Sequence, residues 1–520
     1  MLAFRVWLAC AVLIRLALSP VSASALANVV GTGTAGSCTE AAFDAVFYAV
    51  QTTGGTITFN CGAAPVTILF SAQKQVSANT VLEGGGKITL SGANAVGLFQ
   101  VFNGKTLTLN QITLTRALGS GGAVENFGTL NVNSSQVTNN TSIDNGGGIA
   151  SHGTLNVNNT TFSGNSAAGY GGGIFSDSGQ AAVTNSVFSA NSAVSGGGGM
   201  AVANGASAAI TNSQFSGNQA TDTFAQGGAV VNRESAATTI AGSTFHQNRS
   251  SRGGAISLES GALSVSQSTI TGNWGAYGGG IRQEAGTLTV SKVKLEGNGY
   301  SPTGSKVNTG GGGLSWGNGT ATLTDVTITG NWASYGGGFD HANGTTSLTN
   351  VTISGNQAVG AGGFDTNGGT VNLTNVTIAY NAAGFFGGGI GNRGGALTLK
   401  NVLLAGNVNS STAANWNCYA SIGSTPFNLS SDFTCGLGAG RDNTNPNLRP
   451  LESVNTYTRV HRVFAGSPAL DTGTGVGCPA ADQRGTIRPQ GTACDIGAVE
   501  MTPAELAEPN LMNRLYISYV

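Results

Sequence analysis

A three-part unit of about 25 residues repeats along most of the chain. Each unit opens with a glycine cluster and one apolar residue, continues through an alternating segment, and closes on an asparagine three positions after an apolar residue. The apolar residues after the glycine clusters are Val124, Ile149, Ile174, Met200, Val230, Ile256, Ile281, Leu314, Phe339, Phe364 and Ile390. The asparagines are Asn140, Asn165, Asn191, Asn218, Asn248, Asn273, Asn298, Asn331, Asn356, Asn381 and Asn407. So regular a spacing requires a fold that itself repeats.

Within one unit, the pattern predicts three short β-strands separated by three corners. Apolar and polar residues alternate in each segment, as they do in strands, and 83 glycines in 520 residues would make helices costly. The expected fold is therefore all-β, a right-handed parallel β-helix in which each strand pairs with its equivalent one coil further on. Apolar columns would form the core, and inward asparagines would satisfy backbone groups at one corner.

Composition excludes several other classes of protein. Only 9% of the residues are charged and the net charge is −1, so the chain lacks the basic surface that nucleic-acid binding requires. The glycines are clustered instead of recurring at every third position, which excludes collagen. A hydrophobic content of 40% argues against disorder.

These patterns divide the chain into five segments. We expect a signal peptide over residues 1–27, an N-terminal cap with a short helix over 28–54, the β-helix over 55–410, a disulfide-containing C-terminal segment over 411–500 and a tail over 501–520. The first segment has a basic start, an apolar run and small residues at its end, which is typical of a cleaved secretory signal. No other apolar stretch is long enough to span a membrane as a helix.

Six cysteines remain once the signal peptide is removed. They form three pairs that are local in sequence, Cys38 with Cys61, Cys418 with Cys435, and Cys478 with Cys494. An even number of cysteines in an oxidising compartment predicts three disulfides, with local pairing as the simplest connectivity. Zinc binding is the alternative, but neither Cys-x-x-Cys spacing nor a nearby histidine favours it.

The repeat is lengthened at the same corner in two units. The distance from Asn218 to Val230 is 12 residues and that from Asn298 to Leu314 is 16, where 8 or 9 is usual. Aromatic residues gather at this corner: Tyr170, Phe224, Trp274, Tyr277, Tyr300, Trp332, Tyr335 and Phe386. Aromatic side chains on a polar rod favour contact with carbohydrate or protein, and the candidate ligand-binding residues are Trp274, Tyr277, Trp332 and Tyr335. The alternative is that these rings pack over the glycines and shield the corner.

Acidic residues recur at two outward positions of the strand that follows the glycines. Asp340 and Asp365 share one column, and Glu259 and Glu284 share another, with about 5 Å between neighbours. Stacked carboxylates can bind Ca²⁺ or raise a carboxyl pKa, so these four are the candidate calcium ligands, and no other cofactor is expected. Pectate-lyase-type enzymes combine stacked acids, calcium and a basic residue, which makes Arg282, Asp340 and Asp365 the catalytic candidates. We favour the alternative of a thinly charged, solvated face.

The run from Cys478 to Glu500, CPAADQRGTIRPQGTACDIGAVE, resembles the end of the choice-of-anchor Q family of bacterial exported β-helix proteins. The resemblance implies export to the cell surface or medium and supplies no catalytic residue. Asp482, Arg484, Arg488 and Asp495 match the family's terminal motif, where they would form a structural ion-pair network beside a Cys478–Cys494 bridge. The glycine and asparagine repeats over residues 120–410 are also similar to those of chlamydial polymorphic outer-membrane proteins.

The leading functional hypothesis is a non-catalytic, exported β-helix monomer that binds an extracellular polysaccharide or protein ligand. About 20 residues follow the terminal motif, without a sortase signal or room for a membrane barrel, so release or non-covalent attachment is expected. Two alternatives remain open. One is a polysaccharide lyase or glycoside hydrolase acting along the acidic columns, and the other is a structural spacer in the cell envelope.

Overall fold

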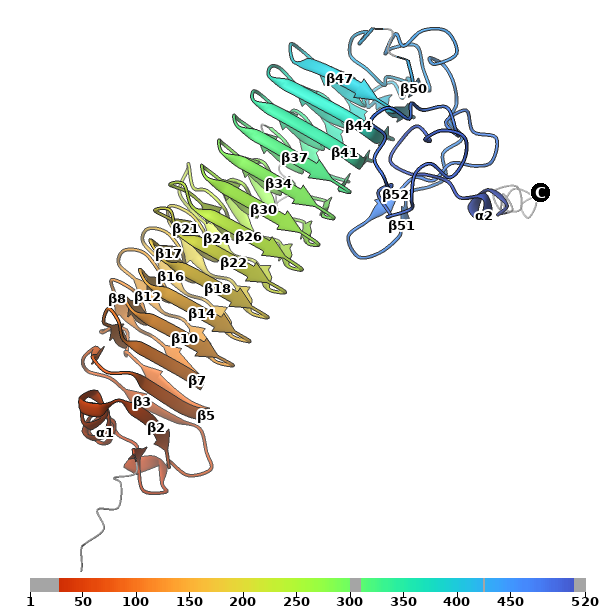
Figure 1. Cartoon of the computed structure of the whole chain (residues 1–520). Helices are drawn as coiled ribbons and strands as arrows, with labels where there is room; N and C mark the ends of the chain where they lie inside the picture. The colour runs from red at the N-terminus through yellow and green to blue at the C-terminus, as the bar shows by residue number, and fades with distance from the viewer. Residues whose placement is uncertain (1–27, 300–309, 424–425, 509–520) are drawn as a thin grey trace, which may run out of the picture.

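The computed structural model describes residues 28–299, 310–423 and 426–508, and these form a rod of stacked coils (Figure 1). The coils make a parallel β-solenoid of about 16 turns with about 25 residues per turn, which confirms the predicted fold class. The proposed signal peptide at residues 1–27 lies outside the described residues. None of the described helices is long and apolar enough to cross a membrane.

One side of the rod is a parallel sheet of 26 strands, here called the long sheet, which bends into two arms. Its first arm contains β2 (Gly55–Phe59), β5 (Thr80–Ser91), β7 (Thr106–Thr115), β10 (Thr129–Asn133), β14 (Thr154–Asn158), β18 (Gln180–Thr184), β22 (Ser207–Thr211), β26 (Ala237–Ala241), β30 (Ala262–Ser266), β34 (Thr287–Ser291), β37 (Thr320–Thr324), β41 (Thr345–Ser354), β44 (Thr370–Ala379) and β47 (Ala396–Lys400), with β1 (Val29–Val30) beside β2. Its second arm contains β3 (Val66–Leu69), β11 (Gln136–Thr138), β15 (Thr161–Ser163), β19 (Val187–Ser189), β23 (Gln214–Ser216), β27 (Thr244–His246), β31 (Thr269–Thr271), β35 (Lys294–Glu296), β38 (Thr327–Thr329), β48 (Leu403–Ala405) and β50 (Leu429–Ser430), and continues through the later halves of β5, β7, β41 and β44.

A second side is formed by two narrow parallel sheets, here called the short sheets. The first contains β8 (Leu118–Gly119), β12 (Thr141–Ser142), β16 (Ser166–Ala167), β20 (Ser192–Ala193), β24 (Gln219–Ala220), β28 (Arg249–Arg252) and β32 (Trp274–Tyr277). The second contains β39 (Trp332–Ala333), β42 (Gln357–Ala358), β45 (Ala382–Ala383) and β49 (Val408–Asn409).

The third side is a ten-stranded parallel sheet, which a smaller sheet precedes. Its strands are β13 (Ile149–Ser151), β17 (Ile174–Asp177), β21 (Met200–Ala203), β25 (Val230–Asn232), β29 (Ile256–Leu258), β33 (Ile281–Gln283), β36 (Leu314–Trp316), β40 (Phe339–His341), β43 (Phe364–Thr366) and β46 (Ile390–Asn392). The smaller sheet contains β4 (Lys74–Val76), β6 (Phe99–Val101) and β9 (Val124–Asn126).

Columns of stacked apolar side chains fill the core between the three sides. Phe162, Phe188, Phe215 and Phe245 stack face to face on successive coils, with ring centroids 4.8, 4.5 and 5.0 Å apart. Each glycine cluster allows neighbouring coils to approach closely, because a Cβ on Gly173 would lie 2.6 Å from the carbonyl oxygen of Gly199.

The repeated asparagines form a buried ladder, as the sequence predicts. The Nδ2 group of Asn191 donates to Oδ1 of Asn218 at 2.9 Å and to the carbonyl oxygen of Phe162 at 3.0 Å. The same pattern continues along the rod, and Asn417 adds one member beyond the eleven of the repeat. Each amide therefore satisfies backbone and side-chain groups that the core would otherwise leave unpaired.

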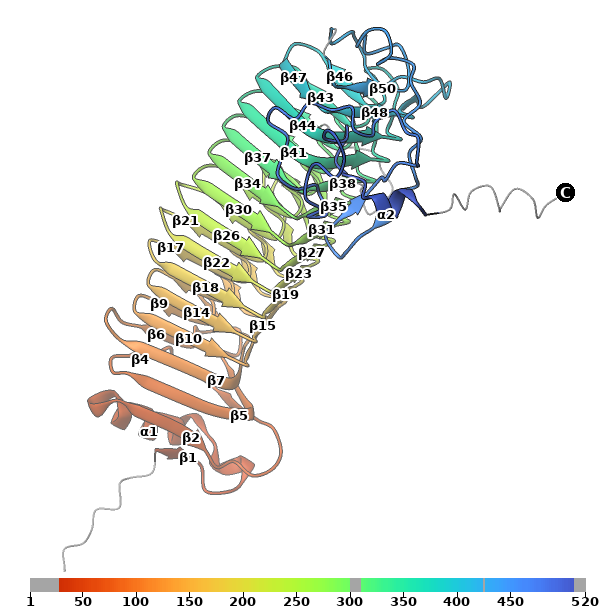
Figure 2. The ribbon, with the colours of Figure 1, turned by 45° about the vertical axis from the view of Figure 1, so that its right-hand side comes forward.

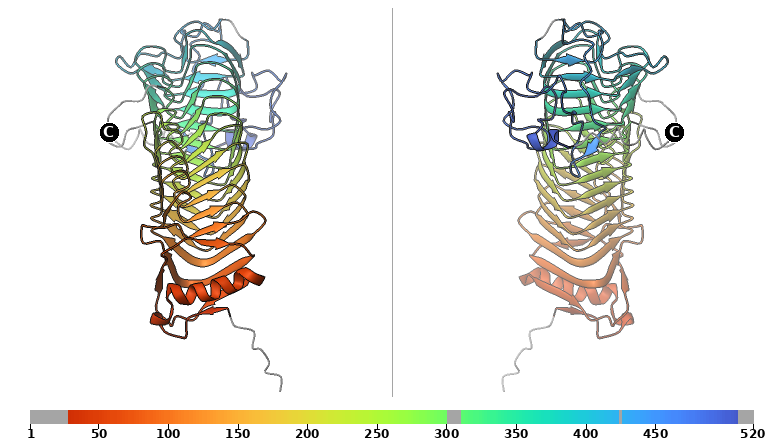
Figure 3. Two further views of the ribbon diagram at one scale, coloured as in Figure 1. Left: turned by 90° about the vertical axis from the view of Figure 1, so that its left-hand side faces the viewer. Right: turned by 90° about the vertical axis from the view of Figure 1, so that its right-hand side faces the viewer.

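The helix α1 (Glu40–Thr53) lies across the N-terminal end of the rod (Figure 3). Its buried residues Phe43, Phe47 and Val50 cover the open end of the core, and the disulfide between Cys38 and Cys61 closes the segment. Such a cap blocks edge-to-edge pairing at the first coil. The disulfides Cys418–Cys435 and Cys478–Cys494 are also present, so all three predicted pairs are confirmed.

The C-terminal segment folds back along the outer face of the long sheet (Figure 2). It contains the antiparallel pair β51 (Glu452–Ser453) and β52 (Arg459–Val460), and the short helix α2 (Pro503–Leu506). Its Gln483 side chain bonds to the hydroxyls of Thr327 and Thr352 at 3.0 and 2.6 Å, and the backbone N–H of Ala498 donates to Thr377 at 3.0 Å. Thr327, Thr352 and Thr377 stand in register on successive coils, so one segment clamps several coils together.

Candidate functional site

The structure brings Asp340 and Asp365 together as neighbours in one column of the ten-stranded sheet. Arg282, Ser315, Asp340 and Asp365 occupy equivalent positions on β33, β36, β40 and β43. The expectation of a solvated face is wrong for Asp365, which is fully buried. The column points away from the core, and neighbouring segments bury Ser315 and Asp365, whereas Arg282 and Asp340 are partly exposed.

Arg393 provides the cover over Asp365. Its Nε donates to both carboxylate oxygens, at 3.0 and 3.1 Å, and its Nη2 also contacts the carboxylate. The guanidinium lies near the rings of both Tyr335 and Phe386, at 5.1 and 5.3 Å from their centroids. Burial raises the pKa of Asp365, and the bonds from Arg393 oppose that rise.

Asp340 lies in a different environment from its neighbour. No group in the described part of the chain donates a hydrogen bond to it. Burial, followed by the charge of Asp365, raises the pKa of Asp340 to about 7. The Asp340 carboxyl can therefore exchange a proton near neutrality.

Arg282 is engaged by groups other than the acids. Its Nη1 donates to Oγ of Ser315 at 2.7 Å, and the guanidinium lies 5.8 Å from the ring of Tyr277. Burial lowers the pKa of Arg282. Among the described residues it forms no ion pair, so the catalytic candidates share a column without forming a directly bonded triad.

Glu259 and Glu284 also stand one above the other, and each is neutralised by an arginine. Arg233 approaches Glu259 at 3.5 Å, and Arg252 approaches Glu284 at 3.3 Å. Burial raises the pKa of Glu259. The described ranges contain no group of three or more potential metal ligands, so the acids predicted for calcium form two separate pairs. The predicted calcium site therefore has no assembled ligand set here.

The four aromatic candidates lie on two different faces. Tyr277, the last residue of β32, lies against Arg282, and Tyr335 lies against Arg393; both rings are 41% exposed, which agrees with a shielding role. Trp274 and Trp332 lie on the short sheets. Trp332 is only 4% exposed, whereas Trp274 is partly exposed. Tyr300, the remaining aromatic residue of the long insertion, lies outside the described residues.

A cavity of about 420 Å³ opens on the first short sheet beside Trp274. The floor is formed by β24, β28 and β32, and one wall is the lengthened corner after Asn218. The cavity is lined by Gln219, Ala220, Thr221, Asp222, Thr223, Arg249, Ser250, Ser251, Trp274 and Ala276. It thus combines an aromatic ring, an arginine, a carboxylate and several hydroxyls, which are groups suited to a saccharide.

Arg249 was not among the residues singled out in the sequence. Its guanidinium lies 4.5 Å from the ring of Trp274, on the neighbouring strand in register. The signal was present, because Arg249 and Trp274 both directly follow a marker asparagine and therefore share a column. A second cavity, of about 320 Å³, lies beside Trp332 and is lined by Gln357, Val359, Phe385 and other uncharged residues.

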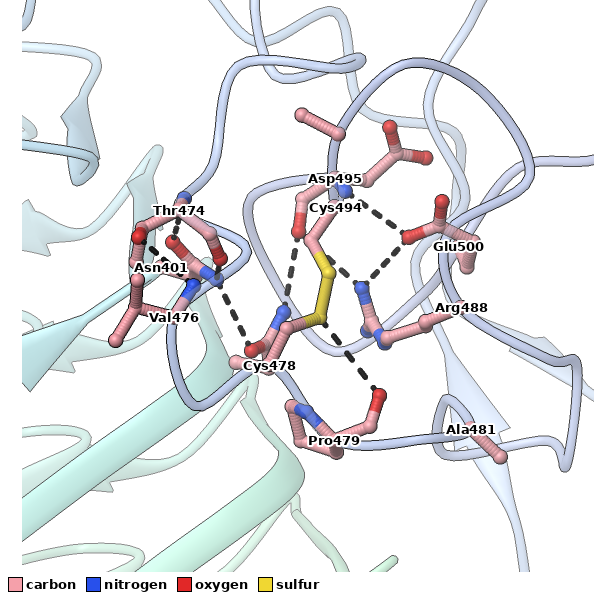
Figure 4. The surroundings of a disulfide bond; sticks show 12 residues. Asn401, Thr474, Val476, Cys478, Pro479, Ala481, Arg488, Cys494, Asp495 and Glu500 are labelled. Carbon is pink, nitrogen blue, oxygen red and sulfur yellow. Dashed lines mark hydrogen bonds and ion pairs between the residues drawn. A yellow bond between two sulfur atoms is a disulfide. The ribbon is translucent and has the colours of Figure 1, made fainter.

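The terminal motif forms an ion-pair network beside the Cys478–Cys494 disulfide (Figure 4). Arg488 pairs with Glu500 at 2.9 Å, with both side chains buried. Asp495 instead accepts backbone N–H bonds from Met501 and Asp471, and burial raises the pKa of Asp495 to about 7.

Arg484 completes this network. It pairs with Asp482 at 2.9 Å and also contacts Glu505 at the start of α2. Glu505 closes a capping box with Thr502. These contacts join residues of the terminal motif to one another and to α2. They give the motif a structural role in the rod.

Comparison with known proteins gives a partial match. The family model for the right handed beta helix region matches residues 150–314. No curated protein and no solved structure matches the chain. The matching family model is neither that of the choice-of-anchor Q family nor that of the chlamydial outer-membrane proteins. The match and the stacked coils agree on one description, a right-handed parallel β-helix.

Proposed function

We propose that this protein is an exported, non-catalytic β-helix that binds an extracellular glycan on its short sheets. The observation that carries the proposal is the cavity of about 420 Å³ in which Trp274 and Arg249 stand side by side. Saccharides are bound by an aromatic ring packed against C–H groups and by polar groups that meet the hydroxyls. Thr221 and Thr223 provide such hydroxyl partners on the wall, and Ser251 provides one on the floor.

Export rests on two features of the chain. Three disulfides form, which is typical of proteins outside the reducing cytosol. The first 27 residues have the composition of a secretory signal. Secretion or attachment to a bacterial surface follows, in agreement with the family that the terminal motif resembles.

The experiment is a glycan array probed with the full mature chain and with Trp274→Ala. Binding of a defined glycan class that falls at least tenfold in the variant supports the site. Tyr48→Ala is the matched control, because Tyr48 is 56% exposed on α1, at the opposite end of the rod from the C-terminal segment. Unchanged binding by Trp274→Ala would remove the proposed site, and the absence of any glycan binding would favour the envelope spacer.

A second candidate function is polysaccharide cleavage on the ten-stranded sheet. It is favoured by the position of Asp340 beside the buried Asp365; burial and this neighbouring charge raise the pKa of Asp340 to about 7, which suits a general acid or base. The test is incubation with polygalacturonate and alginate, with and without calcium, while unsaturated and reducing products are measured. We expect no turnover, because Arg282 and Asp365 are held by Ser315 and Arg393. Product formation that Asp340→Asn abolishes would establish the enzyme.

A further inference from the structure

We propose that the ligand of the Trp274 cavity is an acidic saccharide, a uronic-acid glycan, whose carboxylate is bound by Arg249. This inference rests on the proposed glycan-binding function and adds the chemical class of the ligand. Three observations support it: the Arg249 guanidinium has no ion pair among the described residues, the Trp274 indole lies beside it, and the Asp222 carboxylate lies on the cavity wall.

Arg249 is available for a ligand, unlike the arginines near it. Its side chain is exposed into the cavity and, within the described ranges, forms neither an ion pair nor a hydrogen bond. Arg252, on the same strand, is paired with Glu284 at 3.3 Å, and Arg233 one coil earlier is paired with Glu234 at 2.8 Å. Arg252 and Arg233 are thus neutralised by glutamates, whereas Arg249 has no carboxylate within ion-pair distance among the described residues.

Trp274 supports this guanidinium, whose central carbon lies over the indole, 4.5 Å from the ring centroid. A guanidinium stacked on an indole keeps its N–H groups directed outward in the plane, where they can bind the two oxygens of a carboxylate. Because the stack forms within the protein, less side-chain entropy is lost when the ligand binds. The exposed part of the indole remains available to the C–H face of the same sugar ring.

Asp222 limits how much negative charge the ligand can carry. It lies on the wall made by the lengthened corner, where one oxygen accepts the backbone N–H of Thr223 at 2.6 Å. Its carboxylate can accept hydroxyl hydrogens from a sugar, and it repels a second anionic group. A sugar with one carboxylate and free hydroxyls therefore fits better than a heavily sulfated chain.

The experiment is calorimetric titration of the full mature chain with three probes. The first is a galacturonic acid hexamer, the second is its methyl ester, which has the same backbone without charge, and the third is a sulfated oligosaccharide. We expect the acid to bind at least tenfold more tightly than the ester, and the difference to shrink as salt increases. The sulfated probe is expected to bind more weakly than the acid.

Two variants separate the proposed roles of the cavity residues. Arg249→Gln is expected to lower the affinity for the acid about 10- to 100-fold and to leave the affinity for the ester unchanged, because it removes a charge-assisted pair only. Asp222→Asn is expected to raise the affinity for the sulfated probe. Both residues are exposed, so the unfolding temperature serves as the control for folding.

The outcomes distinguish the acidic class of the ligand from the proposed glycan-binding function. Equal affinity of the wild type for acid and ester, or an equal loss of both in Arg249→Gln, overturns the acidic class and leaves glycan binding in place. Failure of the wild type to bind any saccharide, on this panel and on the array, overturns the proposed function itself. Retention of acid binding in Trp274→Ala places the binding site elsewhere.

Discussion

Asp340 lies beside Asp365 on the neighbouring strand of the ten-stranded sheet, yet Arg393 pairs with Asp365 alone. Two equivalent residues of the repeat therefore differ in protonation behaviour. The difference arises because the segment after β46 supplies an arginine that reaches one coil back, to Asp365.

The first prediction concerns the pH dependence of stability at Asp340. Because the pKa of Asp340 is raised to about 7, the folded state binds more protons than the unfolded state between about pH 4 and pH 7. The contribution of the Asp340 carboxyl to the free energy of unfolding is therefore present at low pH. It is lost as the pH rises through the pKa of the folded state. Asp340→Asn should raise the unfolding temperature at pH 8 and change it little at pH 5. A variant destabilised equally at both pH values would contradict the burial of an uncompensated charge.

A second prediction concerns the asparagine ladder. Asn191→Ala removes an amide that bonds to Asn165, Asn218 and the carbonyl of Phe162, and it should cost about 2–4 kcal/mol. Asn156→Ala is the matched control, because Asn156 forms an equivalent bond to Asn131 on the exposed surface and should cost under about 1 kcal/mol. Denaturant unfolding checks both values, and similar costs for the two variants would argue against burial as the cause.

The docked C-terminal segment gives a third prediction. Gln483→Ala removes the buried bonds to Thr327 and Thr352, so residues 441–508 should exchange amide hydrogens faster. Coils that the segment does not touch, such as that of β14, should keep their protection. Hydrogen exchange measured by mass spectrometry tests this, with Gln490→Ala as a control on an exposed residue of the same segment. Uniform exchange across all coils would show that the segment adds no local stability.

A fourth prediction concerns His152, which lies 2.5 Å from Asp177 across two adjacent coils. The hydrogen bond to Asp177 raises the pKa of His152 above its usual value, so this pair stabilises the fold at low pH and its contribution is lost as pH rises through that pKa. Asp177→Asn should lower the pKa of His152, as measured by NMR titration. An unchanged titration in the variant would mean that the pair is not formed in solution.

Much of the fold could be predicted because the same pattern of glycine, apolar residues and asparagine recurs in every unit. The position of Asn191 in the unit was enough to place it inside the rod and to give it backbone partners. The helix at the N-terminus was recognisable from the apolar spacing of Phe43 and Phe47. These features depend on local pattern and on stacking of equivalents, both of which the sequence contains.

The environment of the acids could not be predicted in the same way. Register placed Asp340 beside Asp365, but burial depends on how Arg393 and Tyr335 fold over the outer face. These covering residues come from corners, where each unit differs from the next. The cavity beside Trp274 was missed for the same reason, since its wall is an irregular corner, although the lengthened spacing after Asn218 marked the place.

The docking of the terminal motif on the side of the rod also could not be predicted from the sequence. Its hydrogen-bond partners, Thr327, Thr352 and Thr377, look like ordinary strand residues. Earlier coils carry Lys294 and Gln214 at this position but also Thr244 and Thr269, so the residue type does not mark the contact. The contact can be recognised only when the distant partner is known.

The docking of the C-terminal segment on the long sheet has a mechanical consequence. A pull along the rod at Glu508 would reach the coils through Gln483, Ala498 and their neighbours, which bond to several strands at once. Several of those bonds would have to break before the segment detached from the rod. A force applied to the C-terminal segment is therefore distributed over several coils.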